Sequence, residues 1–461
     1  MASTTESSAP NAPGVTLATR LSLVGVVLFG LSYMSPSIVM QTFGIISGTS
    51  GGAAPSAYLI AMGAMLLTAL SYGKLARVFP TSGSAYTYAG RLLGRHVGFV
   101  VGWSILLDYF FLPVVAWLVQ SLYLNAQFPE VPIWAWLLIN AGLTTLVNIL
   151  GITMIDRVNR VLLVLAIAVV AAFVAVCVVY LGGSDAPPLA VTDAFWNSTA
   201  TFGTIVAAAS IAAYSFLGFD AVSTLSEETH NPKRNIPRGI IMTVLIGGTF
   251  FTLVAFVMQL VHPGGIFENE STVGYTMSVQ VGGTAFADVL NILQILGGFA
   301  GCVVIQASAT RLMYVMGRDG VLPRRFFGYL HPKFRTPILN ILLVGAASFL
   351  AIGLSLETAA SLINFGAFLA FAMVNICVVS YFVRCRRNGT SVSILGFLIF
   401  PLGGAAVDIY LLLNLGPNAL TLGVGWLVIG LIYLAVLTRG FRRKPPELDL
   451  QTTTPDVVKG K

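Results

Sequence analysis

Apolar stretches long enough to cross a bilayer recur along the chain, and they constrain its fold more than any other feature. A helix needs about 20 mostly apolar residues to span the hydrocarbon core. Of the 461 residues, 56% are hydrophobic and only 9% are charged, a balance unsuited to a water-exposed surface. We therefore predict an all-α polytopic membrane protein with twelve transmembrane helices. The windows lie at about 21–46, 55–76, 97–124, 132–152, 161–183, 201–225, 239–262, 286–316, 337–355, 357–383, 393–414 and 419–438.

The basic residues fall on one side of these windows. Connections that follow the even-numbered windows carry Lys and Arg, whereas those that follow the odd-numbered windows carry none. The positive-inside rule then places the even-numbered connections and both termini in the cytoplasm. The formal net charge of +7 follows from this topology and does not predict nucleic-acid binding, because the basic residues are spread over short loops. The outer connections carry only acidic charge, which either concentrates cations or reflects the same bias.

The stretch 215–228 carries the strongest functional signal. Gly218 interrupts an apolar run, and Asp220 follows at membrane depth, where a carboxylate is costly in free energy and usually functional. We interpret the stretch as a broken helix whose second half starts near Asp220, so that free carbonyl and N–H groups face a cavity. The alternative is that Asp220 only caps the second half-helix.

A second interruption falls in the first window. Ser35, Pro36 and Ser37 lie near its centre, and Pro36 breaks a helix unless the freed backbone groups find partners. Taken alone, a proline inside a helix is more often only a kink. The two breaks, however, occupy matching places in two five-helix halves, about 20–183 and 200–383, and the second half is inverted because five is odd. Inverted repeats with paired broken helices are typical of secondary transporters, whose site lies between the breaks.

These features divide the chain into three parts. Residues 1–19 are polar and predict a disordered cytoplasmic N-terminus. Residues 20–440 form the twelve-helix transporter domain, in which helices 11 and 12, at about 393–438, follow the two repeats. Residues 441–461 form a cytoplasmic tail.

Two more acids lie at membrane depth. Asp108 is in the third window, with Tyr109 as a possible aromatic neighbour for an ammonium group. Asp408 is in the eleventh window, outside the repeats, and is the weaker candidate for a role in transport. Either carboxyl can instead be satisfied by neighbouring hydroxyls or by a proton.

Candidates for gating and coupling lie nearer the cytoplasm. Glu227 and Glu228 follow Asp220 by roughly 10–12 Å along an α-helix, and near-integral turns place Glu227 on the same face as Asp220. The two glutamates either form a structural salt bridge at the membrane edge or close the inward path. Tyr86 is a further gating candidate in an interfacial or re-entrant stretch, 79–89.

The driving ion is a second open choice. Ser308 and Thr310 of the eighth window could offer hydroxyls to a sodium ion opposite helix 1. The ionisable groups along helix 6 favour protons instead.

Several stretches together resemble the amino acid/polyamine/organocation (APC) superfamily of permeases, over roughly residues 20–440. They are Ser-Phe-Leu-Gly-Phe-Asp-Ala at 215–221, the basic loop Asn-Pro-Lys-Arg-Asn-Ile-Pro-Arg at 231–238, and Arg-Leu-Met-Tyr-Val-Met-Gly-Arg-Asp-Gly at 311–320. Within the superfamily the chain is most similar to bacterial putrescine importers, with which it shares Thr-Phe-Gly-Ile at 42–45, Leu-Asp-Tyr at 107–109 and Ile-Asn-Phe-Gly at 363–366. The resemblance implies proton-driven import by alternating access, on a LeuT-type 5+5 inverted repeat with broken helices 1 and 6, in a bacterial inner membrane.

The first break favours an amine over an amino acid. Amino-acid members of the superfamily hold the substrate carboxylate on a Gly-x-Gly turn of helix 1. Here the turn is Ser35-Pro36-Ser37, which donates less because proline has no N–H. A substrate without a carboxylate, such as a diamine, fits that loss.

The resemblance also assigns residues to the substrate. Asp220, with Gly218 and Phe219, takes the place of the family's Gly-Phe-Glu/Asp motif and could pair with one ammonium. Putrescine importers carry an aspartate where this chain has Gln41, whose amide accepts hydrogen bonds but supplies no ion pair. With Asp108 at the distal end, we expect import of putrescine or a related polyamine. An amino-acid permease of the same superfamily is the alternative.

Other functional classes fit poorly. The sequence lacks the His-Glu-x-x-His, phosphate-loop and Gly-x-Ser-x-Gly motifs, so we expect no enzymatic activity. Its four histidines are scattered near loops, and neither a metal nor a cofactor is expected beyond the ion gradient. A channel would need a continuous pore, against which two broken helices argue. The expected partners are the lipid bilayer and a small cationic amine or amino acid.

Overall fold

The computed structural model describes residues 21–79, 85–150, 156–183, 190–227, 229–318, 320–334, 336–443 and 445, without the side chains of 156–160, 162 and 227. The expected N-terminal segment, and nearly all of the expected tail beyond Arg443, lie outside these residues. The described chain is helical, and its one extended pairing is an isolated bridge between Leu21 and Thr229.

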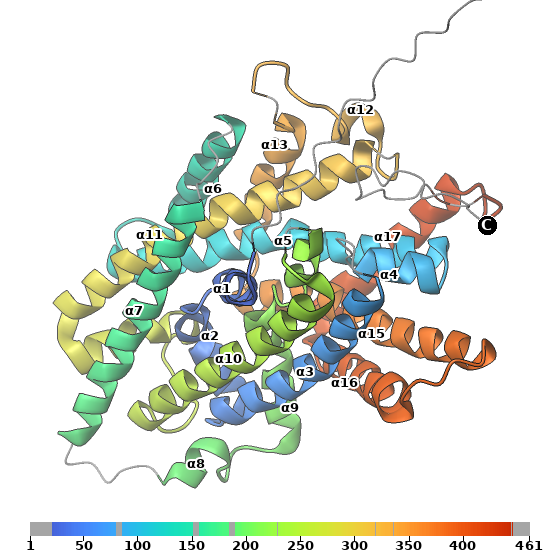
Figure 1. Ribbon diagram of the computed structural model, residues 1–461. Helices are drawn as coiled ribbons and strands as arrows, with labels where there is room; N and C mark the ends of the chain where they lie inside the picture. The colour runs from blue at the N-terminus through green and yellow to red at the C-terminus, as the bar shows by residue number, and fades with distance from the viewer. Residues whose placement is uncertain are drawn as a thin grey trace, which may run out of the picture.

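The helices follow one another in chain order (Figure 1). They are α1 (Leu23–Met34), α2 (Ile38–Ser50), α3 (Ala54–Val78), α4 (Ala85–Leu92), α5 (Arg95–Gln127), α6 (Ile133–Leu150), α7 (Asp156–Gly182), α8 (Val191–Phe195), α9 (Phe202–Ala212), η1 (Ala213–Phe216), η2 (Ala221–Glu227), α10 (Pro232–Val261), η3 (Glu270–Thr272), α11 (Val273–Arg318), α12 (Arg324–Phe327), α13 (Ile338–Ala346), α14 (Ser348–Ala351), α15 (Leu356–Arg387), η4 (Leu395–Ile399), α16 (Phe400–Leu413) and α17 (Pro417–Leu437).

Most of these helices can cross a membrane. Within the described residues, 10 helices are long and apolar enough to do so, and α1 with α2 forms a bent pair that adds an eleventh span. The ninth expected window holds α13 and α14, a shorter apolar segment over Ile338–Ala351. The protein is therefore an all-helical, multi-pass membrane protein.

The long helices form a bundle in which distant segments meet (Figure 1). α3 and α10 lie side by side near its centre, and α15 packs against α5. α6 and α7 contact α11 on one side, whereas α16 packs against α15 and α3 on the other. The fully buried aromatic side chains of Tyr58, Tyr72, Trp117 and Phe219 lie between these helices.

Two helix boundaries differ from expectation. The basic stretch 231–238 is not a loop for most of its length, because α10 begins at Pro232. Proline suits a first helical position, where its fixed φ is helical and its missing N–H would have no partner in any case. α11 is longer than its window because it continues across Gly283, whose φ of 80° and ψ of 170° mark a kink.

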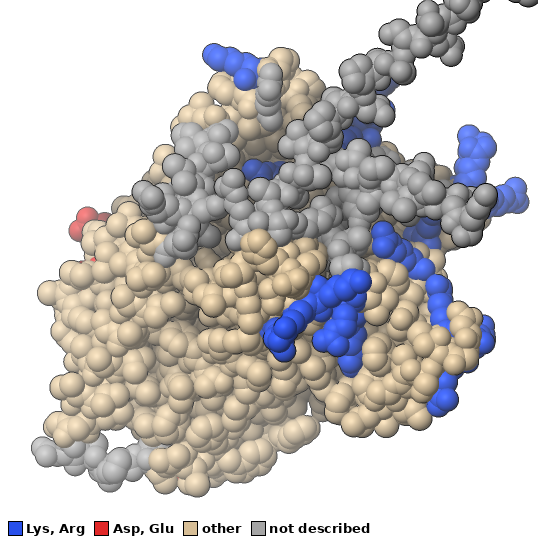
Figure 2. All heavy atoms as spheres, viewed as in Figure 1, with Lys and Arg blue, Asp and Glu red and all other residues tan. Residues whose placement is uncertain are grey.

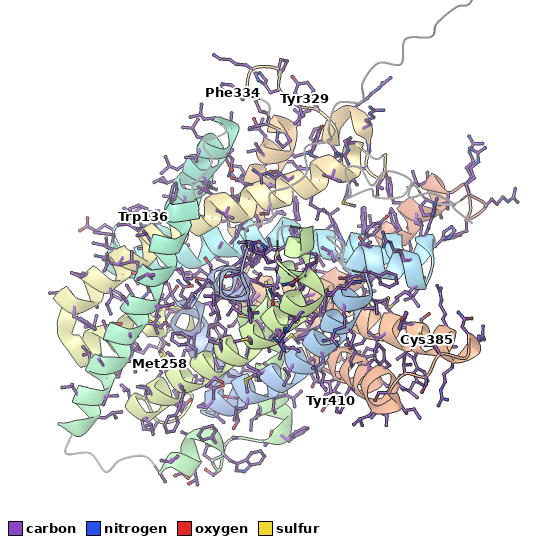
Figure 3. All side chains as sticks on the ribbon, viewed as in Figure 1. Trp136, Met258, Tyr329, Phe334, Cys385 and Tyr410 are labelled. Atoms are coloured by element: carbon purple, nitrogen blue, oxygen red, sulfur yellow. The ribbon has the colours of Figure 1, made fainter. Side chains whose placement is uncertain are left out.

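Basic side chains gather toward one end of the bundle. In Figure 2 the described Lys and Arg side chains lie over the upper, central and right-hand parts of the molecule, and the lower-left surface shows none. Figure 3 places Tyr329 and Phe334, between α12 and α13, at the upper edge. Met258, near the end of α10, lies at the opposite, lower-left end.

Two tryptophans tie α17 to α5. The indole N–H of Trp103 donates to the carbonyl of Trp426, and the indole N–H of Trp426 donates to the carbonyl of Trp103, both at 2.9 Å. Their rings stack with centroids 4.9 Å apart. This reciprocal contact fixes the first half of α5, the helix that carries Asp108.

Candidate functional site

The first span bends at Ser35, Pro36 and Ser37. α1 and α2 meet there at 52°, and Ser35 has a φ of 52°. The N–H of Ser35 donates to the carbonyl of Ser32 at 3.3 Å, and the N–H of Ile38 donates to the carbonyl of Ser35 at 2.9 Å. The turn is thus closed by its own backbone. Because Pro36 has no N–H, the turn offers few backbone donors to an anion.

The sixth span also leaves regular helical geometry. α9 continues into η1, the chain turns at 217–220, and η2 follows. Gly218 has a φ of 111°, which residues with a side chain rarely adopt. A Cβ at Gly218 would overlap the ring of Tyr33, near the end of α1. The two interruptions therefore touch, and glycine is required both for the backbone conformation and for the space.

Backbone amides hold the carboxyl of Asp220. Its Oδ1 accepts a hydrogen bond from the N–H of Gly218 at 3.3 Å, and the N–H groups of Asp220 and Ala221 also donate to the carboxyl. These donors stabilise a negative charge at the start of η2, as in a helix cap. The capping arrangement and a position beside the two breaks thus occur together at Asp220.

A second carboxyl lies beside the first. Asp108, in the middle of α5, is close enough to Asp220 for the two charges to interact. Its Oδ1 is buried, and no described residue donates a hydrogen bond to it. Gly366 lets α15 approach here, since a Cβ at Gly366 would lie 2.5 Å from the carbonyl oxygen of Ser104. A buried carboxylate without a partner is strongly unfavourable, so this pair calls for protons or a cation.

Four tyrosines surround the two carboxyls. The hydroxyls of Tyr33 and Tyr109 share a hydrogen bond, which joins α1 to α5. Tyr72 of α3 and Tyr214 of η1 each interact with one of the two acids. Aromatic faces attract ammonium groups, and phenol oxygens accept hydrogen bonds from them. The arrangement is suited to a small organic cation.

Three of these tyrosines were missed by the sequence reasoning. Tyr33 lies just before the first break and Tyr214 just before the 215–221 motif, so closeness to the breaks could have identified both. Tyr72 belongs to a different span. No pattern in the sequence connects it with either acid.

Phe219 and Gln41 have different surroundings. The ring of Phe219 is fully buried and packs against Phe371 at 5.1 Å and Tyr72 at 5.9 Å, so it positions Asp220 from behind. Gln41 is half-buried in the first turn of α2, and its side-chain amide makes no hydrogen bond with a described residue. Its neighbour Thr42 donates to the carbonyl of Ile38 at 2.9 Å, within the helix. The Gln41 amide is therefore not engaged in holding the helix.

The expected gate is described only in part. Glu228 lies outside the described residues, as does the side chain of Glu227. The backbone up to Glu227 is a 3₁₀ helix, with roughly 2.0 Å rise and three residues per turn. The α-helical spacing assumed for this segment is therefore wrong. Glu227 lies roughly 14 Å beyond Asp220 and roughly 120° away from its face.

The remaining candidates lie on other helices. Tyr86 is on α4, and its ring fills the space above Gly102 of α5. On α11, Ser308 is half-buried, and the hydroxyl of Thr310 donates to the carbonyl of Ala307 at 3.0 Å. A sodium site at Ser308 and Thr310 stays a prediction. Within the described part of the chain, no group of three or more His, Cys, Asp or Glu residues is placed to bind a metal ion.

Comparison with known proteins adds a family to this geometry. Residues 21–438 match the family model described as amino acid permease. The chain is 42% identical to the low-affinity putrescine importer PlaP of Escherichia coli K12, over 95% of this chain and 98% of that protein. It is 27% identical to the branched-chain amino acid permease BcaP of Bacillus subtilis, over 91% and 93%. It is 25% identical to human cationic amino acid transporter 4, over 77% of this chain and 58% of that protein.

Proposed function

Because the chain belongs to the amino acid permease family, we propose that it is a secondary active transporter that imports a small organic cation, with putrescine or a related polyamine as the substrate. The family and the related proteins are permeases and importers, and the protein is a transporter, not an enzyme. The proposal rests on the site as well as on the relatives.

One observation carries the choice of substrate. Asp108 and Asp220 interact at membrane depth, and no basic side chain of the described residues pairs with either carboxyl. A diamine brings two ammonium groups and neutralises both carboxylates. The loaded site then holds no unpaired charge. This lowers the free-energy cost of carrying the substrate through the membrane interior.

We also propose a specific fold and transport cycle, which go beyond the number of spanning helices. We place the twelve windows as twelve spans, with α13 and α14 as the ninth, in a LeuT-type 5+5 inverted repeat. Contact between the two interruptions, through Tyr33 and Gly218, supports a site between broken helices 1 and 6. Alternating access exposes this site to each side in turn, in a bacterial inner membrane, with both termini in the cytoplasm.

Proton symport is the proposed driving force. A dication that occupies both Asp108 and Asp220 leaves no free carboxylate there for a driving proton. The proton therefore needs a site of its own, away from the substrate.

Uptake by the purified protein in liposomes tests the proposal. We expect saturable uptake of radiolabelled putrescine that rises when the outside is acidified, with diamines as the strongest competitors. Branched-chain or cationic amino acids that compete more strongly than diamines would make the protein an amino-acid permease, as its similarity to BcaP allows. Uptake that needs external sodium and ignores the pH gradient would contradict proton symport.

A further inference from the structure

A third carboxyl, outside the substrate site, is buried among polar groups from three helices. Asp408 of α16, Thr68 of α3 and Asn375 of α15 are each fully buried. The Thr68 hydroxyl donates to Oδ2 of Asp408 at 2.8 Å, and the Asn375 amide donates to the same oxygen at 2.9 Å. The Asn375 amide also donates to the Thr68 hydroxyl at 2.9 Å. The three side chains close a triangle of hydrogen bonds.

The hydrogen bonds of the triangle reach only one of the two carboxyl oxygens of Asp408. Oδ1 of Asp408 and Oδ1 of Asn375 are buried, and neither has a hydrogen-bond partner among the described residues. A buried carboxylate normally pairs with a cation or accepts hydrogen bonds at both oxygens. Two acceptor oxygens left without a donor leave a place for a proton.

The backbone of α16 is shaped to admit the triangle. A Cβ at Gly404, one turn before Asp408, would lie 2.8 Å from both polar atoms of the Asn375 amide. Any larger residue at Gly404 would displace Asn375. The cluster therefore depends on a glycine that the helix itself does not require.

Two neighbouring turns connect the triangle to the substrate site. Tyr72 lies one turn beyond Thr68 on α3, and Phe371 lies one turn before Asn375 on α15. Their rings pack edge to face at 6.0 Å, and both contact the ring of Phe219, next to Asp220. Tyr72 interacts electrostatically with both Asp220 and Asp408.

The helices packed against α16 carry few titratable groups near Asp408. On α15, the buried thiol of Cys377 follows Asn375 by two residues and interacts electrostatically with Arg384. α9 and η4, which also lie near α16, contain no titratable residue. Tyr72 is the titratable side chain of α3 that interacts with Asp408. Lys74, farther along α3, donates instead to the carbonyl of Gly396 and lies over the ring of Phe397. A change of charge at Asp408 would therefore act on Tyr72.

We propose that Asp408 is the binding site of the driving proton, and that its protonation is coupled to the substrate site through Tyr72, Phe371 and Phe219. The Asp408 carboxylate takes one proton from outside while substrate occupies the site at Asp108 and Asp220. It returns that proton to the cytoplasm after the substrate leaves. This inference rests on the proposed function.

Two transport assays on the same liposomes separate proton coupling from substrate translocation. Exchange of labelled substrate between loaded and external pools needs no net proton movement, whereas accumulation against a gradient does. We expect D408N to exchange substrate within twofold of wild type and to lose at least tenfold of the accumulation driven by a pH gradient. Accumulation equal to that of wild type would overturn the inference. So would equal loss of both activities, because it would make Asp408 a structural residue.

A matched control acid lies outside both clusters. Asp288 of α11 accepts a hydrogen bond from the Tyr275 hydroxyl at 2.7 Å. We expect D288N to keep both exchange and accumulation within twofold of wild type. Loss of accumulation in D288N equal to that in D408N would make the effect nonspecific and would overturn the inference.

Two further measurements test the inference, the first without relying on how D408N folds and the second without relying on which substrate is carried. T68V keeps the carboxyl but removes a donor to its charged form, so the pH profile of driven uptake should move by about one unit toward higher pH. Infrared difference spectra of purified wild type, taken between acidic and alkaline pH, should contain a carboxylic acid band that D408N lacks. An unmoved profile, or identical spectra, would overturn the inference. Failure of the proposed function is distinct, since wild type would then exchange an amino acid and the same comparisons would be run with it.

Discussion

The protein buries carboxyl groups in two regions, which differ in the groups that donate hydrogen bonds to them. Asp220 receives hydrogen bonds from backbone amides at an interruption of the sixth span, and Asp108 beside it has a bare Oδ1. Asp408 receives its hydrogen bonds from the side chains of Thr68 and Asn375, on helices that continue unbroken past it. In the first region, two carboxyls that interact with each other lie beside the turn at 217–220, an arrangement suited to a charged ligand. In the second, all three polar side chains are fully buried, and Oδ1 of Asp408 and Oδ1 of Asn375 have no hydrogen-bond partner among the described residues.

This difference shows why burial alone does not identify a binding site. Two carboxyls that repel each other favour a doubly charged guest, because one such guest relieves both. A single carboxyl in a triangle of neutral donors has no such demand. The following predictions test whether the two regions have the separate roles assigned to them.

The largest effect is expected at the first region. D220N removes the charge at the break while keeping the shape of the side chain and an acceptor for the Gly218 amide. A lost charge-assisted contact is worth about 1.5–3 kcal/mol, so the half-saturation concentration for putrescine should rise by about 10–100-fold. Uptake kinetics measure the change, with membrane expression followed by fluorescent size-exclusion chromatography. Unchanged half-saturation would remove Asp220 from the site.

The second carboxyl should decide the number of charges accepted. D108N leaves one carboxylate for one ammonium, so the preference for diamines over monoamines should fall by about tenfold. Competition by putrescine and butylamine against one labelled substrate gives the ratio. A ratio that stays constant while both affinities fall would mean that Asp108 acts on the fold, not on the substrate.

Two glycine substitutions compare the regions directly. G218A places a methyl group against the ring of Tyr33 and strains a backbone with a φ of 111°, at a cost of about 1–3 kcal/mol, so substrate exchange should fall several-fold. G404A displaces Asn375 and should reduce accumulation while exchange stays near the wild-type value. The same liposome assays measure both. If the two variants lose exchange alike, the regions are not separate in function.

The smallest effect is expected at Gln41. The side chain is half-buried, and its amide has no hydrogen bond to a described residue. Q41D adds a third carboxylate near the first break and should raise the preference for diamines about threefold. The competition assay with putrescine and butylamine reports the ratio. A wild-type ratio in Q41D would place residue 41 away from the bound amine.

Much of the fold followed from the sequence because the bilayer imposes strong rules. Hydrophobic length located most of the spanning segments, and Pro36 and Gly218 marked places where the chain departs from regular helical geometry, because each limits what the backbone can do. Asp108 and Asp220 were recognised singly as acids at membrane depth. Their closeness, and the tyrosines around them, depend on how α1, α3 and α5 pack, which no local pattern encodes.

The wrongly predicted start of α10 has a local cause. The start of α10 was misread because a proline that normally ends a helix can also begin one. The role proposed for Asp408 has no local signal in the sequence, because the residue lies outside the repeats. Its partners Thr68 and Asn375 are more than 300 and about 30 residues away in the chain, so only the folded structure brings them together.

The 3₁₀ geometry of η2 has a mechanical meaning. Its seven residues are wound more tightly, and are longer, than an α-helix of the same sequence. Relaxation to an α-helix would shorten the segment by roughly 3.5 Å and turn its far end by roughly 140°. The start of η2 is held by the backbone amides that donate to Asp220. The change in length and the rotation would therefore both appear at Glu227. A change in this segment would therefore alter the distance and angle between the proposed substrate site at Asp220 and Glu227 at its cytoplasmic end.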